Sequence, residues 1–139
     1  MRAIIFFLAV IFSFRCYAAT EALEEVNAKR EERGLQKFIE DKSLTKAAKS
    51  CADFRAERLI SGHTSNDFNA VPTGAKADAA GCAAWPPSMG WGSCCAYEHW
   101  KFAGAAWAMG RDGKRYMHLF VREGDGGGSG FWRGRRGRR

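Results

Sequence analysis

FAGAAWAMGRDGKRYMHLFV, residues 102–121, carries the clearest structural pattern in this chain of 139 residues. Two runs of strand-forming residues, 102–109 and 114–122, flank the glycine-bearing turn GRDG. Such a pattern is typical of an antiparallel hairpin. Side chains alternate between the two faces of a strand, so the second run divides into two sets. We expect Met117, Leu119 and Val121 on one face, and Tyr116, His118 and Phe120 on the other.

The segments before the hairpin differ in character. Residues 21–33 have the spacing of an amphipathic helix, and residues 35–40 are expected to be extended. Residues 64–75 are rich in turn formers and predict a loop. Residues 75–84 predict a short third helix. Residues 85–100 contain two prolines and several glycines, which favour irregular structure.

A second helix is predicted from about residue 43 to residue 60. Asp41 or Ser43 can cap its start, because a short polar side chain there accepts a hydrogen bond from a free backbone N–H. Its inward stripe, at spacings of three and four, consists of Leu44, Ala47, Ala48, Cys51, Ala52, Arg55 and Leu59. Cys51 is therefore expected to face the core.

Residues 1–18 have the pattern of a secretory signal peptide. A basic start precedes the apolar run AIIFFLAVIF at 3–12, and small residues stand at Cys16 and Ala18. The apolar run is about half the length of a membrane-spanning helix. We expect cleavage after Ala18 and a secreted, extracellular protein, or a periplasmic one in a Gram-negative bacterium; a retained anchor is the alternative.

The positive charge is concentrated at the two ends of the chain. The formal net charge is +7, of which most comes from the leader and from five arginines in the final segment, residues 124–139. The body at 19–123 is therefore almost neutral, which argues against a basic face for specific nucleic-acid binding. The final segment, rich in glycine and arginine, predicts a disordered tail. That tail can attract anionic polymers or a membrane surface without selectivity.

Four cysteines follow the predicted cleavage site, at Cys51, Cys82, Cys94 and Cys95. An even number of cysteines in a small exported domain argues for disulfide bonds. Three pairings exist, and a bond between adjacent cysteines would form a strained ring. We therefore favour bonds from Cys94 and Cys95 to Cys51 and Cys82, in either combination. No C-x-x-C spacing is present, so a zinc site is not expected.

Four segments together resemble the CAP superfamily of cysteine-rich secretory proteins, venom antigens and plant pathogenesis-related proteins. VNAKREERGL at 26–35 resembles the first helix of that family, and DKSLTKAAKSCADFRA at 41–56 resembles its second. His63 follows the second helix, as a family histidine does. The hairpin at 102–121 resembles the family's closing hairpin.

The resemblance implies an α+β fold of α-β-α sandwich type, with N-terminal helices and a C-terminal antiparallel hairpin, here stapled by disulfides. It also implies a cleft with two histidines and two acids that sometimes holds a divalent metal. This chain lacks the family's glycine-glutamate-asparagine motif, and the second histidine position falls near Ser93 rather than on His99. Only His63 carries over, so the resemblance leaves His63 as a weak metal candidate and implies no cofactor.

The candidate catalytic residues are His63, Glu98 and His99. Glu98 and His99 form an adjacent acid–histidine pair, but neighbours in an extended chain point to opposite faces. His118 is expected to be a half-buried packing residue. The aromatic side chains Trp85, Trp91, Tyr97 and Trp100 can either form a stacking surface or fill the core over the sheet, and we favour the core.

The leading functional hypothesis is a secreted CAP-like binding module, without enzymatic activity, for a lipid, a glycan or a surface partner. One alternative is a hydrolase in which His63 acts with Asp67, Asp78 or Glu98. Another is a cationic effector that acts through the arginine-rich tail.

Overall fold

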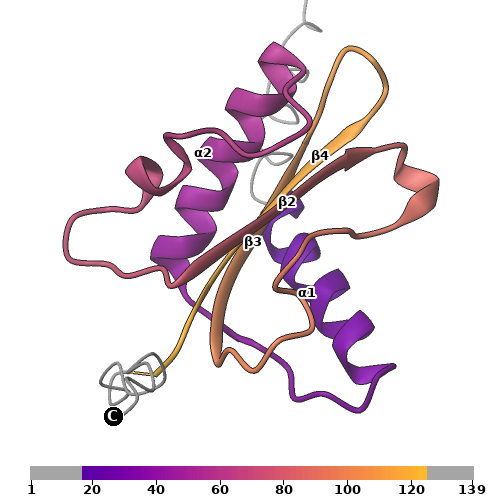
Figure 1. Cartoon of the computed structure of the whole chain (residues 1–139). Helices are drawn as coiled ribbons and strands as arrows, with labels where there is room; N and C mark the ends of the chain where they lie inside the picture. Colours follow the sequence, from indigo (N-terminus) through magenta and orange to yellow (C-terminus); the bar gives the residue numbers. More distant parts are fainter. Residues whose placement is uncertain (1–16, 125–139) are drawn as a thin grey trace, which may run out of the picture.

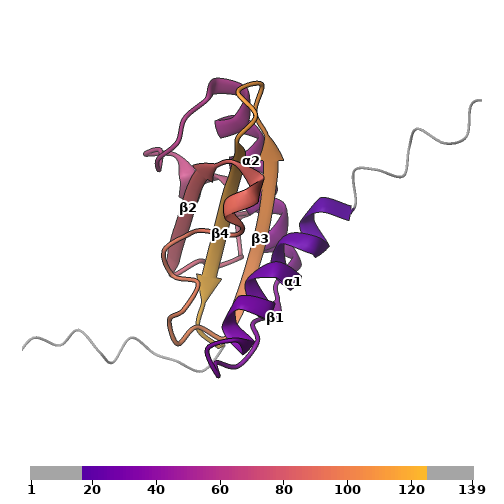
Figure 2. The same ribbon diagram turned by 90° about the vertical axis from the view of Figure 1, so that its right-hand side faces the viewer.

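Two helices cover opposite faces of a four-stranded sheet (Figures 1 and 2). The computed structural model describes residues 17–124. Its elements in chain order are α1 (Tyr17–Glu31), β1 (Ile39–Glu40), α2 (Lys42–Arg58), the 3-10 helix η1 (Asp67–Ala70), β2 (Ala79–Trp85), the 3-10 helix η2 (Pro87–Met89), β3 (Phe102–Met109) and β4 (Arg115–Arg122). The predicted mixed α+β class with helices on both sides of the sheet is thus present.

The predicted hairpin forms the centre of the sheet. β3 and β4 pair antiparallel, from Phe102 opposite Arg122 to Met109 opposite Arg115. The strand order is β1-β3-β4-β2; β2 is antiparallel to β4, and the short β1 is parallel to β3. Figure 2 shows this order across the sheet, with α1 in front.

The predicted third helix at 75–84 is wrong, because most of that segment is strand β2. β2 pairs with β4 along its whole length, from Ala79 opposite Val121 to Trp85 opposite Arg115. Alanine and glycine favour no strand locally, so the long-range pairing with β4 decides the structure. A side chain at Gly81 would lie 2.0 Å from the carbonyl oxygen of Cys94, which explains why a glycine stands where the following loop crosses β2.

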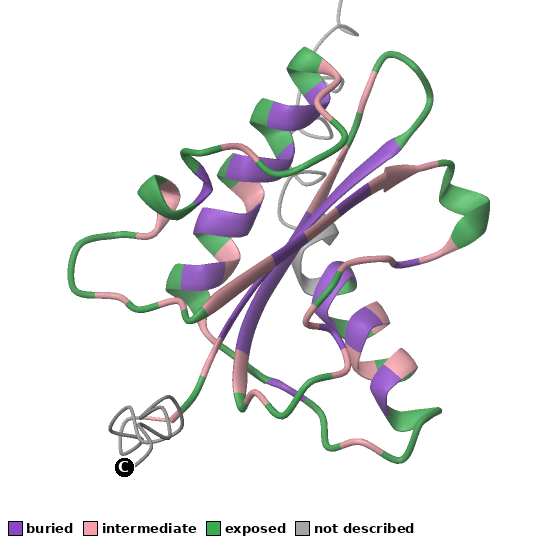
Figure 3. Cartoon of the chain, in the orientation of Figure 1, coloured by how far each residue is buried: buried purple, intermediate pink, exposed green. Residues whose placement is uncertain are grey.

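The sheet separates two apolar cores. The core on the α1 face is made of α1, the segments next to it and every second residue of the strands: Ala22, Leu23, Val26, Phe38, Ala83, Trp91, Ala96, Ala103, Ala105, Met117, Leu119 and Val121. The core on the α2 face consists of Leu44, Ala47, Ala48, Cys51, Ala106 and Phe120. Figure 3 shows the buried sides of both helices turned to the sheet. The alternation predicted for β4 is confirmed.

The tryptophan-rich loop between β2 and β3 belongs to the α1 side. Trp91 is buried in that core, and Trp85, Tyr97 and Trp100 pack against it. The aromatic side chains of this loop therefore fill the core over the sheet, as we favoured.

The first and last residues of both helices differ slightly from the sequence prediction. α1 begins four residues before position 21 and ends at Glu31, where Gly34 adopts a left-handed φ of 70° and the backbone N–H of Leu35 donates to the carbonyl of Arg30. α2 begins at Lys42 and ends at Arg58, and Asp41, one of the two predicted caps, is the residue that caps it. Within residues 17–124, no helix is both long enough and apolar enough to cross a membrane. All but the first residue of the predicted tail at 124–139, and all but the last two residues of the predicted signal peptide at 1–18, lie outside the described residues.

Candidate functional site

A group of polar side chains lies between α2 and the sheet, where the chain leaves α2. α2 ends with Leu59 in a left-handed conformation, with φ at 56°. Arg55, one turn earlier, is fully buried and donates hydrogen bonds to the carbonyls of Ser61, Gly62 and, on β4, Met117. These bonds hold the segment after α2 against the sheet. They place His63 and η1 beside β4.

Asp67 is the centre of this group. It opens η1 and is only 4% exposed. Its Oδ1 accepts hydrogen bonds from the backbone N–H of Thr64 at 3.2 Å and from the Thr64 hydroxyl at 2.6 Å. Its Oδ2 lies 2.8 Å from Nδ1 of His63. Burial would raise the pKa of Asp67, but the hydrogen bonds from Thr64 and His63 and the nearby His118 hold it below its ordinary value. Asp67 is therefore a buried carboxylate.

His118 reaches the same carboxylate from β4. Its side chain is 0% exposed, and its Nε2 lies 3.9 Å from Oδ2 of Asp67. Neither ring nitrogen has a hydrogen-bond partner among the described residues. Burial lowers the pKa of His118 to about 4, because the charged imidazolium is costly away from water. The sequence prediction of a half-buried packing residue is wrong in degree, since this ring is wholly buried and faces an acid.

Cys51 completes the group from α2. Its thiol donates to the backbone carbonyl of Asp67 at 3.5 Å. Burial, together with the charge of Asp67, raises the pKa of Cys51 to about 12. Since the nucleophilic form of cysteine is the thiolate, Cys51 does not act as a nucleophile in this state. We call Cys51, His63, Asp67 and His118 the polar cluster.

Three members of the polar cluster have the chemistry of metal ligands. One ligand atom each from Cys51, Asp67 and His118 lies within 4.8 Å of the other two. His63 stands apart from that trio, because its side chain is 47% exposed and its Nδ1 already contacts Asp67. The structure thus brings together a half-exposed histidine, a buried carboxylate, a buried imidazole and a buried thiol.

The other candidate residues from the sequence lie elsewhere. Glu98 and His99 are exposed on the loop that covers the α1 face, and the Glu98 side chain accepts a hydrogen bond from Trp100 at 2.7 Å. Asp78 accepts from the backbone N–H of Glu123 at 2.8 Å and closes the end of the sheet. Only Asp67, among the acids proposed as partners of His63, contacts it.

Cys51 and His118 were missed as members of one site. The inward stripe of α2 included Cys51, and the alternation of β4 placed His118 with Phe120. If the sequence had also predicted that this face of β4 packs against α2, Cys51 and His118 would have been recognised as neighbours. The periodicity of each element was readable, but the face against which α2 packs was not.

No disulfide bond is present among the four described cysteines. Cys51 belongs to the core on the α2 face, whereas Cys95 packs on the α1 face. The sulfur atoms of Cys94 and Cys95 lie 3.8 Å apart, and both are within 3.7 Å of the carbonyl of Ala80, on β2. Disulfide stapling therefore stays a prediction, and a Cys51–Cys95 bond does not fit this arrangement.

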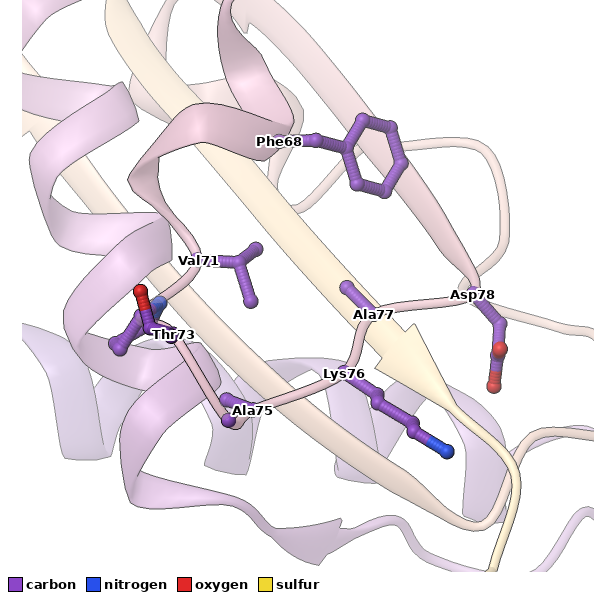
Figure 4. Close-up of a pocket in the computed structure, with 9 residues that line it drawn as sticks. Phe68, Val71, Thr73, Ala75, Lys76, Ala77 and Asp78 are labelled. Atoms are coloured by element: carbon purple, nitrogen blue, oxygen red, sulfur yellow. The ribbon is translucent and has the colours of Figure 1, made fainter.

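An open hollow of about 450 Å³ lies beside η1 and the segment that follows it. Its wall is Phe68 and residues 71–78, the segment that runs from η1 to the start of β2 (Figure 4). Phe68 directly follows Asp67, and its half-exposed ring meets Phe120 edge-on at 5.7 Å between centroids. Lys76 and Asp78 contribute opposite charges to the wall.

Comparisons of the chain with protein-family models, with curated proteins and with solved structures found no match. The resemblance to the CAP superfamily rests on the sequence segments quoted above.

Proposed function

We propose that this chain is an exported CAP-like binding module and that the hollow beside η1 takes a glycan or a similar polar surface ligand. The observation that carries the proposal is the combination, in one open hollow, of the half-exposed ring of Phe68 with Lys76 and Asp78. A ring of this kind packs against the C–H face of a sugar, and charged and polar groups around it bind hydroxyl groups. The two-helix and hairpin segments that resemble the CAP superfamily support the family part of the proposal.

A polar ligand suits the hollow better than a lipid does. Lipid and other apolar ligands are held in enclosed, mostly apolar cavities that bury nearly all of their surface. This hollow is open, and its wall includes Thr73, Lys76 and Asp78. A ligand displayed on a cell wall or cell surface could enter it without being removed from its polymer.

The test is a titration of the protein with a panel of soluble cell-wall and cell-surface oligosaccharides. Binding is measured by nuclear magnetic resonance or by calorimetry. Phe68→Ala should weaken the binding about fivefold or more, since a ring contact contributes roughly 1 kcal/mol. Phe54→Ala is the matched control, because Phe54 is also an exposed ring but stacks on Arg58 of α2. An equal loss in both variants, or no binding of any oligosaccharide, would contradict the proposal.

A hydrolase is the second candidate, and one contact favours it. Asp67 lies 2.8 Å from Nδ1 of His63, and this leaves Nε2 of a half-exposed imidazole free to accept a proton from water. Against it, no hydroxyl or thiol in residues 21–124 is hydrogen-bonded to His63 Nε2, so the attacking nucleophile would have to be a water molecule.

Activity assays on ester and amide substrates separate the two candidates. We expect no hydrolysis that depends on His63. A measurable hydrolytic activity that His63→Ala removes and His99→Ala retains would favour the hydrolase and reject the non-enzymatic binding module.

A further inference from the structure

We infer that Cys51, Asp67 and His118 form a buried site for one zinc-like transition-metal ion between α2 and the sheet. None of these three residues was assigned to a metal by the sequence patterns, and the site is distinct from the open hollow.

His118 is isolated from any hydrogen-bond partner among the described residues. The ring is 0% exposed, and neither nitrogen has a partner among the described residues. Buried polar groups normally have a hydrogen-bond partner, and each one that lacks it calls for an explanation. The 3.9 Å between His118 Nε2 and Asp67 Oδ2 is too long for a hydrogen bond. A cation between these two atoms would contact both of them.

The three donor atoms are close to the geometry that a tetrahedral ion requires. The Cys51 sulfur, an Asp67 oxygen and a His118 nitrogen all lie within 4.8 Å of one another. Zinc–ligand bonds of about 2.0–2.3 Å place two donors on a tetrahedral ion roughly 3.3–3.8 Å apart. The three donors therefore need to approach one another by only about 1 Å, which small side-chain rotations can provide.

The carboxylate is already oriented for this role. Thr64 occupies Oδ1 of Asp67 with two hydrogen bonds, and His63 contacts Oδ2, the oxygen nearer to His118. Hydrogen bonds of this kind around a ligating carboxylate fix its direction and strengthen metal binding. His63 is thus a positioning residue that acts through Asp67, and not a ligand.

Charge balance points to Cys82 as the fourth ligand. The buried charges of Arg55 and Asp67 cancel while His118 and the thiols are neutral. A divalent ion that displaces the Cys51 proton into solvent adds one net positive charge, and a second thiolate removes it. Cys82 lies directly opposite His118 in the β2–β4 pairing, and is therefore placed next to the three other ligands.

The donor types select the metal. Thiolate and imidazole ligands suit zinc and cobalt, whereas calcium and magnesium take oxygen ligands almost exclusively. We therefore expect tight binding of Zn²⁺ and Co²⁺ and no competition from Ca²⁺ or Mg²⁺.

The test uses the full exported protein with its thiols reduced. Elemental analysis should find one Zn²⁺ per chain, and Co²⁺ should produce the intense visible bands of a tetrahedral site together with a thiolate-to-cobalt charge-transfer band.

Cys51→Ser should abolish the charge-transfer band from its sulfur and His118→Gln should abolish tight binding. Cys95→Ser and His99→Ala, on the opposite side of the sheet, are the matched controls and should bind as the parent does.

Two further measurements keep the outcome decisive if a variant fails to fold. One equivalent of Zn²⁺ should raise the melting temperature of the parent protein, because the ion binds the folded state. Cys82→Ser should weaken binding at least about tenfold, and unchanged affinity would overturn its assignment as a ligand. The site itself would be overturned by the absence of bound metal with no change in melting temperature, or by peptide mapping that finds Cys51 in a disulfide. The glycan titration does not depend on this result.

Discussion

Asp41 connects the start of α2 to the end of β4 through a single carboxylate. Its Oδ1 accepts hydrogen bonds from the backbone N–H groups of Ser43 and Leu44 at 3.0 and 3.3 Å, and Oδ2 accepts from Arg122 at 2.7 Å. Partial burial would raise the pKa of Asp41, but Arg122 and the two backbone donors together lower it. One side chain therefore caps a helix and joins it to the sheet.

Removing the ion pair of Asp41 alone should cost less stability than removing the ion pair and the helix cap together. Asp41→Ala removes the cap and the ion pair, and we expect it to cost about 1–2 kcal/mol of the free energy of unfolding. Asp41→Asn keeps a capping oxygen and should cost less. Urea unfolding of the three proteins at pH 7 measures this. Equal losses in the two variants would mean that the cap contributes nothing.

The same residue predicts how stability depends on pH. Because the pKa of Asp41 is lower in the folded chain than in the unfolded one, its charged form stabilises the fold. That contribution is complete above the ordinary aspartate pKa of about 3.9 and is lost as the pH falls through the lower folded value. The difference in melting temperature between the parent and Asp41→Asn should therefore shrink below about pH 4. A difference that stays constant down to pH 2 would contradict this.

A buried arginine near the end of each helix holds the segment that follows. Arg55 does this for α2, and Arg30, 3% exposed, does it for α1. The Arg30 guanidinium donates to the carbonyls of Gln36, Ala96 and Glu98 and stacks on Phe38 at 3.7 Å. Arg30 follows Val26 by four residues on the buried face of α1, and its carbonyl partners explain why a charge is tolerated there.

Replacing Arg30 should destabilise the fold strongly. Arg30→Met leaves buried carbonyl groups without a donor, and we expect a loss of about 3 kcal/mol. Arg33→Met is the control, because Arg33 is exposed and only stacks on Tyr97; it should cost under about 1 kcal/mol. Thermal or urea unfolding measures both. Similar costs for the two variants would show that the buried hydrogen bonds of Arg30 do not matter.

At the scale of elements, the contact between α2 and β3 depends on a glycine. A Cβ at Gly104 would lie 2.0 Å from the backbone nitrogen of Thr45, in the first turn of α2. The helix backbone therefore lies directly on the strand at this point, and neither element can move aside without disturbing the sheet pairing.

Gly104→Ala should cost about 3 kcal/mol or more, since overpacking against backbone cannot be relieved by a side-chain rotation. Gly62→Ala is the matched control, because nothing lies within 4 Å of its added Cβ and its φ is not positive. That variant should stay close to the parent in stability. Comparison of the two melting temperatures decides whether close packing of α2, rather than glycine replacement in general, is responsible.

Strand β2 was not predicted from the sequence. Its residues AAGCAA contain no β-branched side chain, and alanines favour helix when considered alone. In the folded chain these small side chains fit between the hairpin, α2 and the loop at 90–100. Local propensity therefore predicted the wrong element where long-range packing outweighed it.

At the scale of the whole molecule, the sheet divides the cysteines. Cys51 belongs to the core on the α2 face and Cys82 pairs with His118, which faces the same side, whereas Cys94 and Cys95 lie on the loop of the α1 side and beside the edge of β2. Disulfide connectivity is therefore a direct test of the arrangement of layers.

Peptide mapping of the non-reduced protein should show no bond between Cys51 and Cys95. Cys51 belongs to the core on the α2 face and Cys95 packs against the core on the α1 face, so such a bond would join opposite sides of the sheet. Mapping after blocking of free thiols measures this, and the same digest reports whether Cys51 is free, as the metal site requires. A Cys51–Cys95 link would mean that the loop at 90–100 covers the other face of the sheet.

The sequence by itself determined the units of this protein: two amphipathic helices, the closing hairpin and the alternation of β4. These depend on local periodicity, turns and spacings of a few residues, so a single sequence contains them. Only the tertiary structure decided which strand face meets α2, that residues 79–85 form an edge strand, and that Cys51, Asp67 and His118 meet. Those three residues are brought together by packing across the sheet, and this packing depends on the shape of the whole core rather than on any short stretch of chain.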